Sequence, residues 1–329
     1  MSNDTVTINT RTLGGSGIDL SEVGIGLWAQ GGHWGPTDDE GALEAIEAAL
    51  DAGVTFFDTA DVYGENGHSE RILAKAMKGR RDRFLVGTKI GWIDFDGEKN
   101  VSQYDTVDEL VAGVESNLER LGTDHVELIQ CHIYFREPNA EVFIEGFRKL
   151  KQQGKVRAWG ISTGDFELLK FFDQDGDCDS LQIDYSIFNR DPEREILPYC
   201  RANNLGVIVR GPLAMGILTG KFREDQTFPE SDFRKAWIDD ADQNAQYCSD
   251  LGLVDKLRAI AGDDRTLSQL ALQFVLANDA VTTVIPGARN RKQSIQNSSA
   301  ARLPALTASE LASIDKLVRP GGGRKIWPA

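Results

Sequence analysis

The feature that most constrains the fold is a repeated alternation along almost the whole chain. Short apolar, β-branched runs recur, and each is followed by a longer amphipathic stretch. This alternation is typical of parallel α/β folds, in which each strand is followed by a helix that packs on the sheet. Eight such units can be counted. The predicted strands are 23–27, 55–60, 84–90, 126–132, 158–163, 180–186, 206–211 and 282–287.

Eight strand–helix units predict a closed (β/α)8 barrel, the TIM barrel. The predicted helices are 38–51, 69–77, 107–120, 141–152, 166–172, 192–203, 267–276 and 290–298. An open doubly wound sheet would normally stop at about five to seven strands and carry GxGxxG after its first strand. Here the first strand leads into GIGLWAQGGHWG, which has glycines but no following helix. The open sheet is therefore disfavoured.

Three segments lie outside the repeat. The opening TINTRTLGGSGIDLSEV predicts a β-hairpin that turns at Gly14 to Gly17 and closes the bottom of the barrel. The long, charged loop 222–245 after strand seven suggests a lid, because loops of this length are usually functional. The glycine-rich end, 311–329, is not expected to form a barrel element and is expected to reach back over the mouth. No linker divides the chain, so we expect a single domain over residues 1–329.

Composition excludes several classes of function. The net charge of −15 argues against a nucleic-acid partner, whose phosphates require a basic face. No apolar run reaches the ~18 residues that would span a membrane, and no signal peptide is visible, so we expect a cytoplasmic protein. The four cysteines, Cys131, Cys178, Cys200 and Cys248, form no CxxC pair, so neither a metal site nor a redox dithiol is predicted. The pattern leaves a monomer and a homo-oligomer both open.

Four residues that can move or polarise a proton fall where a barrel carries its catalytic groups, at the C-terminal ends of strands and in the loops that follow. They are Asp58, Tyr63, Lys89 and His132. Each has a structural alternative. In that alternative, Asp58 caps the next helix and Tyr63 is a packing residue. Lys89 then extends to water, and His132 is a hydrogen-bonded core histidine. Their coincidence at one mouth favours a catalytic site. If His132 points inward, the neighbouring Cys131 points outward and is a packing residue.

These four residues, together with the sequence around them, resemble the aldo-keto reductases, and the resemblance covers essentially the whole chain. The most specific stretches are FFDTADVYGENGHSERILAKAM and GPLAMGILTGKF. The resemblance implies that the four residues form the family's catalytic tetrad, with Tyr63 protonating the oxygen of a carbonyl that receives a hydride. Lys89 is expected to lower the tyrosine's pKa from its usual value of about 10, and Asp58 to hold Lys89 protonated. His132 is expected to donate to the same oxygen.

The resemblance also implies a nicotinamide cofactor, NADP(H) or possibly NAD(H). Ser162 and Gln182 would bind the carboxamide, and the backbone from Gly211 to Leu213 would line the pyrophosphate together with Lys221. The full set of expected cofactor residues is Gly26, Leu27, Trp28, Ser162, Gln182, Arg210, Gly211, Leu213, Lys221, Gly287, Arg289, Gln293 and Asn297.

A basic run near the end of the barrel bears on the choice between the two cofactors. Arg289, Gln293 and Asn297 are spaced four apart, which would place them on one face of a helix whose N-terminus attracts anions. Arg289 with Arg291 and Lys292 suggests a 2′-phosphate, and hence NADP. The alternative is a solvated helix face.

Two departures from the family pattern affect the substrate pocket. Many relatives carry a tyrosine that stacks on the nicotinamide where this chain has Arg210, and an arginine there would favour polar or anionic substrates. After His132, many relatives read Trp-Pro-Asp where this chain reads Ile133, Tyr134 and Phe135. Contacts from that loop therefore cannot be transferred.

Three tryptophans on early mouth loops, Trp28, Trp34 and Trp92, would form an apolar substrate wall, with packing as an equal alternative. The function expected from all of these residues is an NADP-dependent oxidoreductase that interconverts aldehydes, ketones or sugar-like carbonyls and alcohols. Two alternatives are a cofactor-binding regulatory subunit with slow turnover and a Schiff-base aldolase that uses Lys89 as an amine. A nearby Asp58 disfavours the aldolase, because it keeps the lysine protonated. The physiological substrate and the preferred direction stay open.

Overall fold

Eight parallel strands form one sheet that closes on itself. A computed structural model describes residues 8–31, 38–91, 94–95, 100–101, 104–133, 136 and 139–326. The sheet order is β12-β11-β10-β9-β8-β5-β4-β3, and isolated parallel bridges join Val23 to Val284 and Gly26 to Gly287. The strands are β3 (Ile25–Gly26), β4 (Phe56–Asp58), β5 (Leu85–Ile90), β8 (Val126–Cys131), β9 (Val156–Ser162), β10 (Ser180–Asp184), β11 (Gly206–Arg210) and β12 (Val281–Val284).

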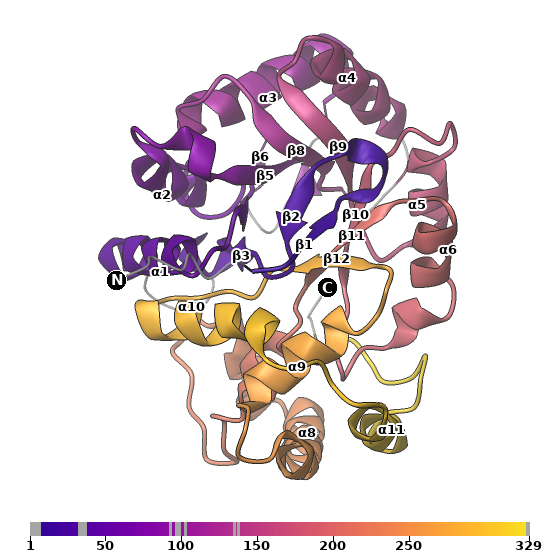
Figure 1. Ribbon diagram of the computed structural model, residues 1–329. Coiled ribbons are helices and arrows are strands. Elements are labelled where there is room, and N and C mark those ends of the chain that lie inside the picture. Colours follow the sequence, from indigo (N-terminus) through magenta and orange to yellow (C-terminus); the bar gives the residue numbers. More distant parts are fainter. Residues whose placement is uncertain are drawn as a thin grey trace, which may run out of the picture.

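Helices follow these strands and surround the barrel (Figure 1). They are α1 (Asp39–Asp51), α2 (His68–Met77), α3 (Val107–Leu121), α4 (Ala140–Gln152), α5 (Phe166–Phe172), α6 (Ile196–Ala202), α9 (Leu267–Leu276) and α10 (Arg291–Ser298). Capping boxes start two of them, with Thr106 and Thr266 as the capping residues of α3 and α9. The predicted (β/α)8 barrel is confirmed. The helix predicted at 192–203 begins instead as a short 3₁₀ turn, Asp191–Glu193, ahead of α6.

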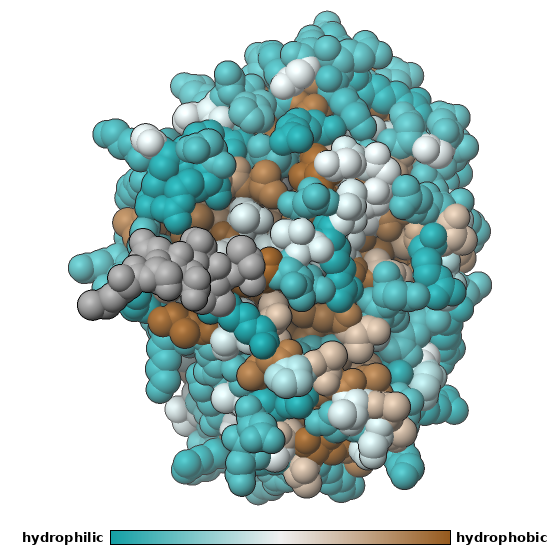
Figure 2. All heavy atoms as spheres, viewed as in Figure 1, coloured by the Kyte–Doolittle hydropathy of each residue, from teal (hydrophilic) through white to brown (hydrophobic). Residues whose placement is uncertain are grey.

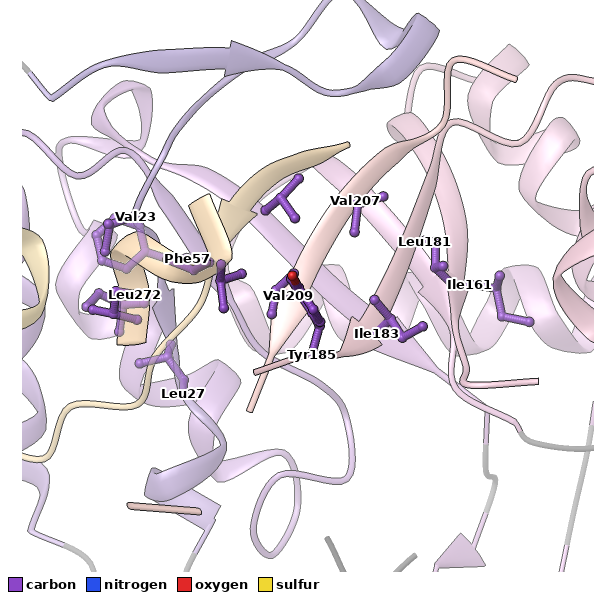
Figure 3. Close-up of a cluster of buried hydrophobic side chains, with 14 of the residues drawn as sticks. Val23, Leu27, Phe57, Ile161, Leu181, Ile183, Tyr185, Val207, Val209 and Leu272 are labelled. Atoms are coloured by element: carbon purple, nitrogen blue, oxygen red, sulfur yellow. The ribbon is translucent and has the colours of Figure 1, made fainter. Parts of the chain in front are cut away.

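Alternate residues of each strand face two separate hydrophobic layers. On β11, Ile208 belongs to the cluster inside the barrel, whereas Val207 and Val209 belong to the larger layer between strands and helices. Figure 3 shows part of this outer layer, with Val207 and Val209 near strand residues such as Ile183 and with Leu272 of α9 in the same cluster. Side chains buried in this way contribute roughly 1.5–3 kcal/mol each.

The predicted N-terminal hairpin is present and closes the bottom of the barrel. It consists of β1 (Thr10–Thr12) and β2 (Asp19–Ser21), joined through a 3₁₀ turn at Gly14–Ser16. Gly14 has a φ of 51°, and a Cβ there would lie 2.5 Å from Gly206 N, at the N-terminal end of β11. Only glycine fits so close to the strand ends. The hairpin lies across the strands in Figure 1.

The region after β11 contains more helix than the sequence suggested. The predicted loop 222–245 includes α7 (Ala236–Asp239) and the start of α8 (Ala241–Ala261). Asp240 caps α8 by accepting from Gln243 N, and Tyr247, Leu251 and Val254 are buried at helical spacing along it. A second element that was not predicted is a short antiparallel pair in the loop after β5, formed by β6 (Asp94–Phe95) and β7 (Asn100–Val101).

The C-terminal segment is partly helical and then crosses the mouth. Its first part belongs to α11 (Ala308–Leu317), a helix beyond the eight strand–helix units, which starts at the capping box of Thr307 and Glu310. Residues 318–326, here called the C-terminal strap, then run along the loop after β10. Gly323 bridges to Asn189, and Arg324 N donates to Phe188 O at 2.7 Å. The strap thus reaches the C-terminal ends of the strands, as expected.

On the face shown in Figure 2, the surface over the surrounding helices is mainly hydrophilic, with teal atoms there. Ile295, 47% exposed, is the one large hydrophobic side chain with high exposure among the described residues. No described helix combines the length and the apolar character needed to cross a membrane.

Candidate active site

The structure brings Asp58, Tyr63, Lys89 and His132 together at the C-terminal mouth of the barrel. Asp58 ends β4, Lys89 is the penultimate residue of β5, and His132 directly follows β8. These three strands are adjacent in the sheet. Tyr63 lies in the loop after β4, where its backbone N–H donates to Ala60 O at 3.2 Å.

Lys89 is held by three hydrogen bonds. Its fully buried Nζ donates to Asp58 Oδ1 at 2.6 Å, to Thr59 O at 2.8 Å and to the hydroxyl oxygen of Tyr63 at 3.0 Å. An ammonium group has three N–H donors, so each of them has a partner. Burial by itself lowers the pKa of Lys89, but Asp58 and Tyr63 outweigh it and the pKa is raised. Lys89 is therefore an ammonium ion with a fixed direction.

Asp58 balances this charge. Its side chain is 2% exposed, and its second carboxylate oxygen, Oδ2, accepts from Gln182 Nε2 at 2.8 Å. Burial raises the pKa of Asp58, while Lys89 and Gln182 act in the opposite direction. With every donor and acceptor of the Asp58–Lys89 pair matched, the pair is charge-neutral and rigid.

The phenol of Tyr63 is a neutral proton donor. Burial raises its pKa, and the ammonium of Lys89 opposes that rise without cancelling it. The sequence predicts a lowered pKa for Tyr63. Lys89 does lower that pKa, as expected, but burial raises it by more. Because the hydroxyl oxygen accepts from Lys89, its own proton is available for another acceptor.

His132 is uncharged. Burial, followed by the positive charges of Lys89 and Arg210, holds its pKa well below the usual 6.5. Its ring meets that of Tyr63 edge to face, with 5.9 Å between the centroids. The Nδ1 atom is buried and has no hydrogen-bond partner in the described part of the chain. A neutral imidazole beside Tyr63 has one N–H to donate.

Two glutamines next to the tetrad leave a carbonyl oxygen unused. Gln182 Nε2 donates to Gln130 Oε1 at 2.9 Å as well as to Asp58. Gln182 Oε1 is buried and finds no partner among the residues described. Ser162, the neighbour of Gln182 in the register of β9 and β10, is half-buried at the mouth. These two side chains fit a ligand amide, which supplies the N–H that Gln182 Oε1 lacks.

The other expected cofactor residues lie on the strands beside these glutamines. Gly26 and Gly287 are bridged where β3 meets the end of β12, and Leu27 is buried next to them. Arg210 ends β11, and Gly211 follows it with a φ of 65°.

Beyond Gly211, the remaining expected residues of this region follow the chain away from β11. Leu213 precedes the 3₁₀ segment Ala214–Thr219, and Lys221 is exposed just after it. Trp28 begins the 3₁₀ turn Trp28–Gly31 and packs on Phe233 at 5.8 Å between ring centroids. The segment proposed as a lid therefore contacts the mouth.

The expected helix face at 289–297 has a different geometry. Helix α10 begins at Arg291 with Asn290 as its cap, so Arg289 lies before the helix and not on its face. Gln293 Oε1 accepts from the backbone N–H of Arg289 at 2.9 Å, and Asn297 Nδ2 donates to Gly287 O at 3.2 Å. The two side chains brace the loop that presents Arg289.

Two of the predicted pocket residues, Trp34 and Trp92, lie outside the described residues, as do Tyr134 and Phe135 of the loop after His132. Ile133 is 2% exposed and belongs to the core. Cys131 is fully buried in the layer between strands and helices, which agrees with its assignment to packing.

The sequence analysis missed a second group of buried charges beneath the tetrad. Glu70 on α2 is 0% exposed, accepts from Arg120 Nε of α3 at 2.6 Å and accepts from Thr88 Oγ1 at 2.6 Å. Arg120 also donates to Asn117 Oδ1, and Asn117 Nδ2 donates to Lys89 O at 3.2 Å. The sequence signal for this group is Glu70 itself, a carboxylate that lies three residues before Leu73 on the apolar face of α2.

Asp61 lies beside this group and gives a prediction on pH dependence. Burial, then repulsion from Glu70, raises its pKa to about 8, with Arg120, Val62 N–H and Lys89 opposing the rise. The folded chain therefore binds a proton that an unfolded aspartate, with a pKa of about 3.9, has released. The contribution of Asp61 to stability should therefore fall as pH rises from 4 to 8, by up to ~1.4 kcal/mol per pH unit. Asp61→Asn should flatten this slope in urea unfolding, and an unchanged slope would contradict the assignment.

The chain matches the model of the aldo/keto reductase family over residues 22–319. It is 33% identical over 289 residues to Aldo-keto reductase YhdN of Bacillus subtilis, covering 86% of this chain and 85% of that protein. It is 28% identical to Aldo-keto reductase yakc [NADP(+)] of Schizosaccharomyces pombe, covering 98% of each chain. Among solved structures, it is similar to the glycerol dehydrogenase AKR11B4 from Gluconobacter oxydans, with a TM-score of 0.82, 30% identity and 99% of each chain covered.

Proposed function

Because the chain belongs to the aldo/keto reductase family, it is an oxidoreductase, and we propose that it uses NADP(H) to interconvert small aldehydes, ketones or sugar-like carbonyls and their alcohols. One observation carries the proposal. All three N–H groups of Lys89 are occupied, and one of them is directed at the hydroxyl oxygen of Tyr63. This arrangement prepares a tyrosine for proton transfer.

The four residues have separate tasks in this proposal. The reduced nicotinamide supplies a hydride when it is bound. Tyr63 gives its proton to the carbonyl oxygen as negative charge develops there, and Lys89 stabilises the phenolate that remains. Asp58 fixes Lys89 and keeps it protonated. His132, neutral and edge-on to Tyr63, donates its N–H to the same oxygen. In the reverse direction the same residues oxidise an alcohol.

The cofactor would lie along β9 to β12 and β3. Gln182, with its unused carbonyl oxygen, and Ser162 would hold the carboxamide. The backbone at Gly211 and Leu213, with Lys221, would hold the pyrophosphate. Arg289, presented by the braced loop before α10, would meet the 2′-phosphate. The name of the Schizosaccharomyces pombe relative supports NADP, and NAD(H) is the alternative.

Arg289→Ala tests the choice of cofactor. Losing a charge-assisted hydrogen bond of roughly 1.5–3 kcal/mol should weaken NADPH at least about tenfold and leave NADH nearly unaffected. Fluorescence titration of both cofactors measures the two losses. Arg157→Ala, which removes an exposed guanidinium near the start of β9, is the matched control. Equal losses for both cofactors would assign Arg289 to the adenine or pyrophosphate and make NAD an equal candidate.

The reaction itself is tested by following reduced nicotinamide absorbance with aldehydes, ketoses and polyols and both cofactors. Turnover supports the enzyme, whereas tight cofactor binding without turnover on any of these compounds supports the regulatory subunit. Borohydride trapping of a carbonyl compound on Lys89 would support the aldolase. The hydrogen bonds of Lys89 argue against that result, because a protonated amine with three partners is no nucleophile.

We further propose that residues 1–329 act as one domain, in the cytoplasm. The observation that supports the cytoplasmic location is that all four cysteines are free thiols, three of them buried. The oligomeric state, monomer or homo-oligomer, stays open.

A further inference from the structure

Two buried glutamines meet inside the barrel beside the tetrad. They are Gln130 on β8 and Gln182 on β10. Alternation along β8 places Gln130 inside, because Leu128, two residues earlier, belongs to the cluster inside the barrel. Strand β9 lies between β8 and β10, and its residue in register with Gln130 is Gly160. Since Gly160 has no side chain, the two amides can meet across β9.

Hydrogen bonds fix the direction in which the Gln182 amide faces. One oxygen of the Asp58 carboxylate accepts from Lys89, and the other accepts from Gln182 Nε2 at 2.8 Å. Gln182 Nε2 also donates to Gln130 Oε1 at 2.9 Å. A carboxylate can only accept, so the NH2 group of Gln182, and not its oxygen, faces Asp58. The oxygen therefore points away from both partners, and it is the buried Oε1 that has no partner in the described chain.

Asp58 alone would not fix this amide. The last torsion of a glutamine side chain is broad, so an amide held at one point can turn about that point. A second acceptor on another strand removes this freedom, and Gln130 Oε1 is that acceptor. The Gln182 amide is thus held from β4 and from β8 at once.

Gln130 itself leaves a hydrogen-bond donor unused. Its Nε2 is buried and has no partner among the residues that the structure describes. A buried donor without a partner costs stability, so a glutamine at this position needs an explanation. Turning the Gln130 amide over would bring its NH2 group against the NH2 group of Gln182. The part of the Gln130 amide that forms a hydrogen bond is therefore its oxygen, and the partner is Gln182.

We propose that Gln130 is a positioning residue for the nicotinamide cofactor. Together with Asp58, it orients the Gln182 amide so that Oε1 accepts from the N–H of the cofactor's carboxamide. The inference rests on the proposed function and adds a residue that acts through Gln182. It also links the two parts of the site, because Asp58 holds both Lys89, which serves the proton donor, and Gln182, which serves the hydride donor.

The test measures the binding of three ligands to wild type and to Gln130→Met by calorimetry. NADP⁺ offers the carboxamide N–H, its 3-acetylpyridine analogue carries a methyl group in place of that NH2, and 2′-phospho-ADP-ribose lacks the nicotinamide. Wild type should bind NADP⁺ about tenfold more tightly than the analogue, which leaves Gln182 Oε1 without a donor. Gln130→Met should reduce this ratio to about threefold or less. The Kd for 2′-phospho-ADP-ribose should not change.

Two further variants separate orientation of Gln182 from general packing. Gln130→Glu keeps an oxygen acceptor at the same distance along the side chain, so it should restore most of the wild-type ratio. Gln273→Met removes another buried amide, which accepts from Arg265 and donates to Pro304 O. It should lower the midpoint of thermal unfolding and keep the ratio. Gln130→Met should keep the midpoint close to wild type, because it also removes the unused donor.

The outcomes distinguish this inference from the proposed function. An unchanged ratio in Gln130→Met would overturn the inference, as would an equal loss of the ratio in Gln273→Met or no recovery in Gln130→Glu. The expected ratios without turnover of any carbonyl compound would keep the role of Gln130 and reject the reductase. Turnover by a wild type that binds NADP⁺ and the analogue equally would keep the reductase and reject the role of Gln130.

Discussion

Tyr63→Phe is expected to lower kcat by about 10²–10⁴-fold, the usual contribution of a positioned general acid. The reason is local. The phenylalanine keeps the ring packed against His132 but removes the hydroxyl that accepts from Lys89 Nζ at 3.0 Å. Cofactor affinity should change little, because the backbone and amide groups proposed to hold the cofactor are untouched. Steady-state rates and NADPH titration on the same preparation provide both readouts.

Lys89→Met serves as the harsher companion to Tyr63→Phe. It leaves the Asp58 carboxylate buried without its partner, so it should reduce both activity and stability. Tyr63→Phe should reduce activity alone. Near-normal reduction by Tyr63→Phe would reject the tyrosine as the proton donor, whatever Lys89→Met does.

Arg120→Met is expected to destabilise the fold by about 3 kcal/mol, the lower end of the range for breaking a buried ion pair. Methionine keeps much of the apolar stem but leaves Glu70, which is 0% exposed, without its cation. Thr88 Oγ1 then remains as the neighbouring donor at 2.6 Å. Burial already raises the pKa of Glu70, and the loss of Arg120, which opposes that rise, should raise the pKa further.

Denaturant unfolding at pH 7 measures this loss, and an exposed ion pair provides the control. Arg201 and Asp279 are 3.0 Å apart with side chains 64% and 73% exposed. Arg201→Ala should therefore cost only about 0–1 kcal/mol. Similar losses for Arg120→Met and Arg201→Ala would mean that the Glu70–Arg120 pair is solvated in the folded chain.

The tetrad could be predicted from sequence because its position follows from topology. Strands of a parallel barrel all end at one mouth, so a polar residue at the end of an apolar run is placed there whatever the loops do. Asp58 ends such a run, Lys89 lies one residue before the end of one, and His132 directly follows one. The strand boundaries differ by only a few residues from the structure, since burial of β-branched side chains marks them directly.

Other elements could not be predicted, for two kinds of physical reason. Helix α8 carries its apolar residues on a narrow face within a strongly charged segment, which masked its periodicity, and Asp240 as its cap was overlooked. Arg289 does not lie on the helix face because Asn290 caps α10 and the helix begins only at Arg291. The pairing of Glu70 with Arg120 joins two helices and depends on how they pack. Burial of Tyr63 at the mouth outweighs the effect of Lys89 and reverses the expected shift of the tyrosine's pKa.

The closure of the barrel has a consequence for how the chain folds during synthesis. The seam is made by Val23 with Val284 and by Gly26 with Gly287, which lie near opposite ends of the sequence. Neighbouring strands in the middle of the order, such as β8 and β9, can pair early as the chain emerges. The seam cannot form until the ribosome has made nearly all of the barrel. Until then, one edge of β3 stays unpaired. A nascent chain is therefore an open, edge-exposing sheet until its last strand arrives.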